Sequence, residues 1–286
     1  MDYHAPDTID DAVDLLTHTT QRPRVLAGGT DLLVQMRSGR VEPGLIVDVK
    51  HIAELREIKQ DANGFQIGAA VTGAEMGEHQ ALRRAWPGVV EATNLIGSTQ
   101  VQGRATPGGN LCNASPAADS VPAMIAASAV CIVAHKGGRK EIPVKDFVVA
   151  PGRNCLGPGE LLVAFRLPPR PPRSLDAYLR LIPRTEMDIA VVGAGVSLTL
   201  GPDGLCTAAN VGIGAVAPTP LLVPDAGAAL IGTKVDDAAL ANAAAAARAA
   251  CKPIDDKRGT VDYRIHVAGV LVQRAARIAL NRIRNA

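Results

Sequence analysis

The sequence predicts an α+β protein made of a small parallel β–α–β unit, a larger part of mixed and antiparallel strands, and a carboxyl-terminal domain. Three observations carry this prediction. The first fifty residues alternate strand and helix, and the next part mixes short helices with strands. Beyond residue 174, alternating apolar residues precede two strongly helical stretches.

The first fifty residues contain the elements of a small parallel unit. TIDDAVDLLTHTT has apolar residues at helical spacing. PRVLAGG is typical of a short buried strand that opens into a turn, TDLLVQMRSG of a short helix, and LIVDV of a second buried strand. Two strands joined by a helix at this spacing predict parallel pairing, because parallel strands need a crossover connection.

Residues 51–173 change character and contain more varied elements. EHQALRRAWPGVVEATNLIGS is helical in period, but Pro87-Gly88 divides it into two helices. SVPAMIAASAVCIVAHKGGRKEIPVKDFV predicts a helix, a strand, a turn and a strand, and GELLVAFRLP predicts another strand. The proline-rich PPRPPRS at 168–174 is the predicted linker.

Residues 174–286 form the predicted carboxyl-terminal domain. AVVGAGVSLTLGPDGLCTAANVGIGAV alternates as antiparallel strands do and contains a PDG turn. DDAALANAAAAARAA and YRIHVAGVLVQRAARIALNRI are both helical, the second with an apolar stripe opposite its arginines. This part is therefore expected to combine an antiparallel sheet with helices.

Composition excludes several classes of protein. A net charge of +2 and aromatic residues at 2% of the chain argue against a nucleic-acid partner. No run approaches the roughly 18 apolar residues of a membrane span, and the amino terminus lacks the features of a secretory signal. The five cysteines have none of the short spacings of iron–sulfur or zinc ligands. We therefore expect a cytoplasmic protein without a membrane span.

Two glycine clusters stand where apolar structure breaks: AGGTDLL at residues 27–33 and TPGGNLCNASPAADS at residues 106–120. Paired glycines let consecutive backbone N–H groups point inward and form a cradle for an anion. The neighbouring Thr, Asp, Asn and Ser side chains can bond a polar chain or sugar. One such cluster is more typical of a tight turn, whereas two in one chain favour a phosphorylated cofactor.

Other catalytic patterns are missing. Neither cluster fits the P-loop or the dinucleotide fingerprint, and GAGVSL at residues 193–198 continues as a strand instead of opening a helix. No nucleophile with its base and no metal cluster emerges. The acidic pairs at 10–11, 236–237 and 255–256 are each explained by a nearby helix start. The sequence supports cofactor binding better than acid–base catalysis by side chains.

Together the two clusters resemble those of the FAD-binding medium subunit of the molybdenum hydroxylases. This family includes xanthine dehydrogenase, carbon monoxide dehydrogenase and bacterial heteroaromatic hydroxylases. The similarity extends over nearly the whole chain. It includes the YHAP start, LIVDV, GELLVAFRLP, RTEMDIAVVG, VAPTP and DYRIHVAGVLVQRA. Both clusters in this order, with that carboxyl-terminal half, are highly specific for the family.

The resemblance implies a two-lobed FAD-binding domain of the PCMH/VAO type over residues 1–173, with lobes 1–55 and 56–173. A carboxyl-terminal domain of the CO-dehydrogenase-flavoprotein type would follow over residues 174–286. FAD would lie extended between the two lobes.

The resemblance also assigns site residues. In the first cluster, backbone amides would wrap the pyrophosphate, with Gly28, Gly29 and Thr30 closest to it: Val25, Leu26, Ala27, Gly28, Gly29, Thr30, Asp31 and Leu32. The second cluster would contact the phosphates and the ribityl chain through Thr106, Gly109, Asn110, Asn113, Ser115 and Asp119. Leu162 would pack against the flavin or adenine. Arg180 stands where the family often has a lysine near the flavin.

The same resemblance implies an oxidoreductase subunit without a catalytic residue of its own. Substrate would be hydroxylated at a molybdopterin cofactor on a large subunit, and electrons would cross 2Fe–2S clusters on a small iron–sulfur subunit. FAD on this chain would pass them to NAD⁺, a quinone or oxygen. The complex would be a heterotrimer that dimerises. A self-contained flavin oxidoreductase and an assembly subunit without flavin stay open as alternatives.

Overall fold

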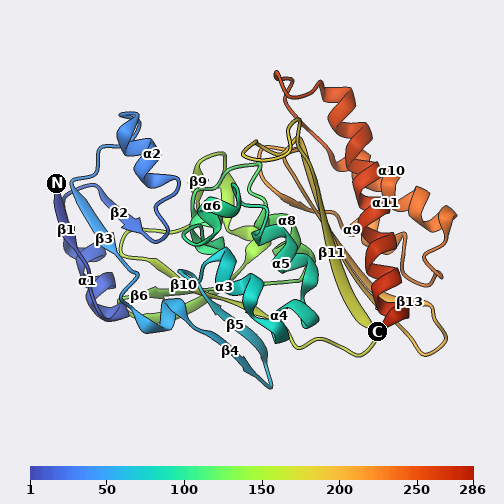
Figure 1. The fold of residues 1–286 in the computed structure, drawn as a ribbon, viewed down its shortest axis with the longest axis horizontal. Coiled ribbons are helices and arrows are strands. Elements are labelled where there is room, and N and C mark those ends of the chain that lie inside the picture. The colour runs from blue at the N-terminus through green and yellow to red at the C-terminus, as the bar shows by residue number, and fades with distance from the viewer.

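The computed structural model describes residues 1–286 and arranges them as three bodies in a row. An amino-terminal lobe, a central lobe and a carboxyl-terminal domain follow one another along the long axis (Figure 1). Each body contains a sheet, and three hydrophobic clusters stabilise the whole. None of the helices combines the length and the apolar composition that a membrane crossing requires.

The amino-terminal lobe contains a three-stranded parallel sheet in the order β1–β3–β2. Its strands are β1 (Asp2–His4), β2 (Pro23–Leu26) and β3 (Leu45–Asp48), joined by α1 (Ile9–His18) and α2 (Leu32–Arg37). The predicted parallel unit is confirmed. Strand β1 was not predicted, because three residues are too few to show a period of two.

The central lobe carries a five-stranded antiparallel sheet in the order β4–β5–β10–β6–β7. Its strands are β4 (Ile58–Asp61), β5 (Gly64–Gly68), β6 (Val130–His135), β7 (Gly138–Pro143) and β10 (Leu161–Leu167). The connection from β5 to β6 contains α3 (Gly73–Glu78), α4 (Gln80–Ala85), α5 (Pro87–Thr93), α6 (Thr99–Gln102), α7 (Pro107–Cys112) and α8 (Ser120–Ala126). The short elements η1 (Ala53–Arg56), η2 (Val144–Asp146), β8 (Val148–Ala150) and β9 (Arg153–Asn154) complete the lobe. Pro87 opens α5 directly after α4, so the predicted division into two helices is confirmed.

Strand β10 holds the two lobes together because its faces belong to different cores. Leu161 and Val163 are buried in the hydrophobic cluster of the amino-terminal lobe, which also contains residues of α1 and β3. Leu162 and Phe165 are buried in the cluster of the central lobe. The pairing of β10 with β6 shifts register between Leu162 and Ala164, so a bulge re-aims the strand between the two cores.

The carboxyl-terminal domain has an antiparallel sheet in the order β11–β12–β13–β14, as predicted. The strands are β11 (Ser174–Leu181), β12 (Val192–Leu200), β13 (Cys206–Gly214) and β14 (Leu221–Leu222), and the helices are α9 (Pro224–Ala228), α10 (Asp237–Ala250) and α11 (Val261–Asn285). Helices α10 and α11 cover one face of this sheet (Figure 1). GAGVSL lies within β12, so its interpretation as sheet is confirmed.

Helix α8 of the central lobe packs against the opposite face of this sheet. Ala194, Val196 and Leu198 of β12 point toward α10 and α11, where they are fully buried. Gly195 lies between them in sequence and faces the other way. A Cβ at Gly195 would be 2.8 Å from the carbonyl oxygen of Pro122 in α8. Only glycine lets the helix backbone approach so closely.

Candidate functional site

The first glycine cluster forms the turn between β2 and α2. The backbone N–H groups of residues 28–32 make no hydrogen bond within the chain, although Leu33 N–H donates to the carbonyl oxygen of Gly29 at 3.0 Å. Gly29 has φ +79°, a conformation that favours glycine. Thr30 and Asp31 make no side-chain hydrogen bond here. Because backbone N–H groups are rarely left unpaired, this row of donors is suited to an external anion.

Gly28 brings the two glycine clusters together. A Cβ at this position would lie 1.9 Å from the carbonyl oxygen of Arg104 and 3.2 Å from the Cα of Ala105. These two residues come directly before the second cluster. The close approach at Gly28 is thus between two segments of the protein itself, a contact that sequence reasoning had assigned to a ligand.

The second glycine cluster begins as a helix, α7 over Pro107–Cys112, which differs from the loop that the sequence suggested. Thr106 is the N-cap of α7, and its hydroxyl oxygen accepts a hydrogen bond from Gly109 N–H at 2.9 Å. Pro107 occupies the first helical position, where an N–H would have no partner in the helix. The strong N-cap and this proline outweigh the low helix propensity of the two glycines.

Three polar side chains of the second cluster also bond within the protein. Asn110 Oδ1 accepts hydrogen bonds from the N–H and the hydroxyl of Ser120, at 3.2 and 2.7 Å. Asn113 Oδ1 accepts one from Gln35 Nε2 of α2 at 3.0 Å, and Ser115 Oγ accepts one from Ala117 N–H at 3.2 Å. The amide nitrogens of both asparagines make no bond within the chain and can donate to a ligand.

Asp119 and Arg180 were predicted separately, and the structure joins them in a buried ion pair. Arg180 Nη1 lies 3.0 Å from Asp119 Oδ2 and donates to the carbonyl oxygen of Leu95 at 2.7 Å. Burial raises the pKa of Asp119 to about 6, and Arg180 opposes this effect. The other carboxylate oxygen, Oδ1, is buried without a partner. The pair therefore offers a free acceptor and a fixed positive charge.

Leu162 lies apart from these polar groups. It pairs with Val133 of β6 and is 3% exposed, within the core of the central lobe. Val25 of β2 is exposed and Leu26 is buried. A cavity of about 680 Å³ elsewhere in the amino-terminal lobe contains none of the predicted site residues; it is lined by Asp2, His4, Ala5, Pro6, Asp7, Asp11, Asp14, Leu15, His18, Thr19, Gln21 and Leu45.

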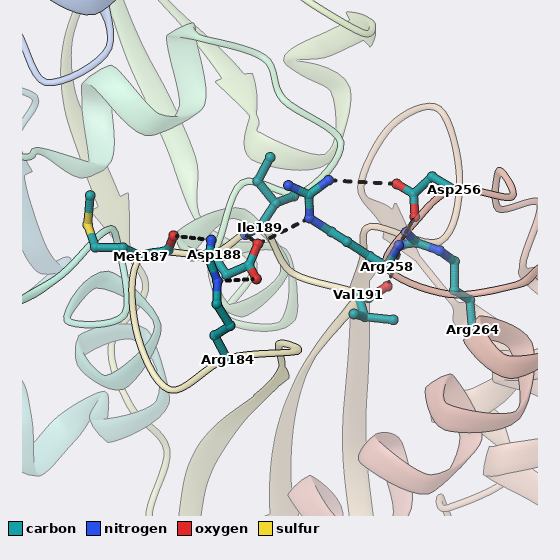
Figure 2. Close-up of polar contacts among 8 residues, drawn as sticks. All are labelled: Arg184, Met187, Asp188, Ile189, Val191, Asp256, Arg258 and Arg264. Atoms are coloured by element: carbon teal, nitrogen blue, oxygen red, sulfur yellow. Dashed lines mark hydrogen bonds and ion pairs between the residues drawn. The ribbon is translucent and has the colours of Figure 1, made fainter.

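The segment that follows Arg180 is held by a chain of ion pairs (Figure 2). Asp188 accepts hydrogen bonds from Arg184 Nε at 3.0 Å and from Arg258 Nε at 3.1 Å. Arg258 reaches Asp256 at 3.9 Å, and Asp256 bonds the buried Arg264 at 2.6 Å. The helix start at residue 261 therefore does not account for Asp256. Its carboxylate instead compensates the buried guanidinium of Arg264, a contact that no sequence pattern indicated.

Sequence reasoning missed three contributors to this site. Gln35 joins the lobes, the Arg104 carbonyl fixes the first cluster, and Tyr178 lies two residues before Arg180 on the same face of β11. Only Tyr178 had a usable signal, since residues i and i+2 share one face of a strand.

The arrangement fits FAD. Unpaired N–H groups at residues 28–32 suit a pyrophosphate, and the asparagine amides lie on the cluster that begins directly after the segment that Gly28 contacts. The orphaned Asp119 Oδ1 suits a hydroxyl or N–H donor.

Comparison with known proteins agrees with this fit. Residues 1–170 match the family model of the FAD binding domain in molybdopterin dehydrogenase, and residues 177–279 match that of the CO dehydrogenase flavoprotein C-terminal domain. The carbon monoxide dehydrogenase medium chain of Afipia carboxidovorans is 35% identical over 284 residues, which covers 99% of this chain and 98% of the relative. The xanthine dehydrogenase FAD-binding subunit of Escherichia coli O157:H7 is 33% identical over 221 residues, 77% of this chain and 75% of the relative.

A solved structure has the same fold. The carbon monoxide dehydrogenase from Hydrogenophaga pseudoflava that lacks the Mo-pyranopterin moiety of the molybdenum cofactor matches with a TM-score of 0.94 at 32% identity. The match covers 99% of this chain and 98% of the other. This chain therefore belongs to the FAD-binding subunits of the molybdenum hydroxylase family and is the flavoprotein subunit of an oxidoreductase.

Proposed function

We propose that this chain is the electron exit of a heterotrimeric molybdenum hydroxylase. FAD on this chain takes electrons from 2Fe–2S clusters of a small subunit, after hydroxylation at the molybdopterin cofactor of a large subunit. The acceptor is NAD⁺, a quinone or oxygen. When bound, FAD supplies the chemistry of accepting electrons singly and releasing them in pairs. The chain's own residues bind and orient the cofactor.

The observation that carries the proposal is the row of free N–H groups at residues 28–32. Hydrogen bonds from backbone N–H groups to a phosphate are charge-assisted and therefore stronger than bonds between neutral groups. The rigid contact between Gly28 and Arg104 fixes these donors opposite the second cluster before any ligand arrives. These features support pyrophosphate binding by this turn.

The rest of the cofactor takes the positions beyond the second cluster. Asn110 and Asn113 offer their amide nitrogens, and Asp119 offers a carboxylate oxygen to a ribityl hydroxyl or flavin N–H. Arg180 holds Asp119 and places a positive charge beside the ring. Since Leu162 is buried in the core, it would contribute only apolar packing on the side of the cofactor that faces the core.

The proposed partners follow from the relatives. One relative is named as a medium chain of carbon monoxide dehydrogenase and another as an FAD-binding subunit of xanthine dehydrogenase. Both names describe one chain of a complex that contains several. We infer a heterotrimer with a small iron–sulfur and a large molybdopterin subunit, and a dimer of these trimers. Purification from the native source, with mass spectrometry of the copurifying chains, tests this composition.

The binding proposal is tested by titrating the purified flavin-free chain with FAD and with riboflavin. Quenching of flavin fluorescence should reveal tight binding of FAD and much weaker binding of riboflavin, because riboflavin lacks the pyrophosphate. A chain that purifies without flavin absorbance and binds neither compound would exclude the proposed function. Equal affinity for FAD and riboflavin would mean that residues 28–32 do not bind the pyrophosphate. Oxidation of a small substrate by the isolated chain would instead support a self-contained enzyme.

A further inference from the structure

Two buried polar atoms beside the Asp119–Arg180 pair lack hydrogen-bond partners. One is Asp119 Oδ1 and the other is the hydroxyl of Tyr178, a residue that is 3% exposed. Burying a hydroxyl or a carboxylate oxygen without a partner is costly, so such atoms are rare in folded proteins. Two of them beside one ion pair indicate a common missing partner.

The position of Tyr178 is set by the two strands that carry it. Its ring belongs to the hydrophobic core of the central lobe, although β11 is part of the carboxyl-terminal domain. On the neighbouring strand, Gly193 pairs with Arg180, and a Cβ at Gly193 would lie 2.5 Å from the Tyr178 hydroxyl. Glycine at position 193 thus leaves the space that the hydroxyl occupies, on the same face as Arg180.

The electrostatics of the three groups are coupled. Burial and the negative charge of Asp119 raise the pKa of Tyr178 well above its ordinary value, so its hydroxyl keeps its proton and remains a donor. Asp119 Oδ2 is engaged with Arg180, whereas Oδ1 can accept from more than one donor.

We propose that Tyr178 is a flavin-positioning residue, whose hydroxyl and the free carboxylate oxygen of Asp119 hydrogen-bond the same polar group of the bound FAD. This inference rests on the proposed function. The carboxyl-terminal domain then positions the cofactor through two residues of β11: Arg180 holds one carboxylate oxygen of Asp119, and Tyr178 bonds the ligand group that donates to the other oxygen.

The test is Tyr178→Phe, which keeps the ring in the core and removes only the hydroxyl. The dissociation constant of FAD should rise about tenfold or more, as for a hydrogen bond to a charged group. The matched control is Tyr263→Phe, since Tyr263 is 47% exposed.

A double-mutant cycle with Asp119→Asn shows whether the hydroxyl acts on the same ligand group as the Asp119 carboxylate. If it does, Tyr178→Phe should change FAD affinity much less in the Asp119→Asn background than in the wild type. Equal effects in both backgrounds would overturn the proposal. An unchanged affinity in Tyr178→Phe would overturn it as well.

Gly193→Ala provides an independent variant that displaces the hydroxyl without removing it. The added methyl group should weaken FAD binding in the wild type, and the affinity should suffer no further loss when Tyr178→Phe has already removed the hydroxyl. Additive losses in the double variant would contradict the role of the hydroxyl. A wild-type chain that binds no FAD would instead refute the proposed function, so the two failures are distinguishable.

Discussion

Gly28 lies so close to Arg104 that a Cβ at residue 28 would be 1.9 Å from the Arg104 carbonyl oxygen. Gly28→Ala therefore forces two backbone segments apart, and overpacking of this kind costs roughly 1–3 kcal/mol. We expect the free energy of unfolding of the flavin-free protein to fall by about this amount, as measured by urea denaturation.

The matched control for this change is Gly103→Ala, because no atom lies within 4 Å of a Cβ at Gly103 and its φ of −68° suits any residue. This variant should keep the stability of the wild type. If Gly28→Ala lost FAD but no stability, residue 28 would contact the cofactor directly and the contact with Arg104 would be secondary.

The residues of the site could be predicted from sequence more readily than their roles. Glycine pairs with neighbouring Asn and Thr indicated the two clusters, and family resemblance gave Asp119 and Arg180. Which atom lies opposite each residue depends on contacts between distant segments. The bond of Thr106 to Gly109 N–H and the bond of Asn113 to Gln35 are examples. Residue type allows either a ligand or a protein partner in such cases.

The fold was predictable where elements are long and periodic. Helix α11 and strand β12 show clear periods in the sequence, and both are confirmed. The three residues of β1 carry no period, and α7 contains two glycines that propensity places outside helices. Strand β1 forms because it pairs with β3, and helix α7 forms because Thr106 caps its amino-terminal end.

The buried carboxyl groups make stability depend on pH. Burial raises the pKa of both Asp119 and Asp176 to about 6, although Arg180 and Arg170 oppose it. For both residues the pKa in the folded state exceeds the ordinary aspartate pKa of 3.8. The folded state therefore holds these protons more tightly than the unfolded state. Their contribution to stability is complete below about pH 4 and is lost as pH rises through about 6.

We expect the free energy of unfolding to fall between pH 4 and pH 7, by up to roughly 3 kcal/mol for each group. Urea unfolding at several pH values, followed by the fluorescence of the buried Trp86, measures this slope. Asp176→Asn should flatten the slope even if it lowers stability overall, because Arg170 loses its charged partner at 2.6 Å. An unchanged slope in this variant would assign the pH dependence to other groups.

Asp188 anchors the exposed loop between β11 and β12. The hydrogen bond from Ile189 N–H, together with Arg258 and Arg184, lowers the pKa of Asp188 to about 2. Asp188→Asn removes the charge that holds both arginines. We expect trypsin to cleave after the exposed Arg184 several times faster in this variant, because a loop must loosen to enter a protease.

Glu186→Gln is the control for this experiment, since Glu186 lies exposed in the same loop and makes no ion pair. It should leave the cleavage rate unchanged. Anchoring by Asp188 is present above its ordinary pKa and is lost only as pH falls through about 2. Equal cleavage rates in Asp188→Asn and the wild type would show that the backbone, not the ion pairs, fixes the loop.

Gln35 controls how firmly the turn at residues 28–32 is held. Helix α2 has six residues, none of them buried, so it has little apolar packing of its own. Its side-chain bond to the second cluster is that of Gln35 Nε2 with Asn113 Oδ1 at 3.0 Å. Gln35→Ala removes this bond at a cost of about 1 kcal/mol, and the loss falls on the local opening of α2 and its turn.

We therefore expect the hydrogen-bonded amides of this segment, such as those of residues 33 and 35, to exchange about fivefold faster in Gln35→Ala, while the buried strands of the central lobe exchange as in the wild type. FAD should also dissociate faster, because the donors of the turn are less well ordered. Gln80→Ala, at an exposed position of α4, is the matched control. Uniformly faster exchange over the whole chain would mean that the bond stabilises the global fold. Unchanged exchange throughout would mean that the contact of Gly28 with Arg104 is sufficient to order the turn.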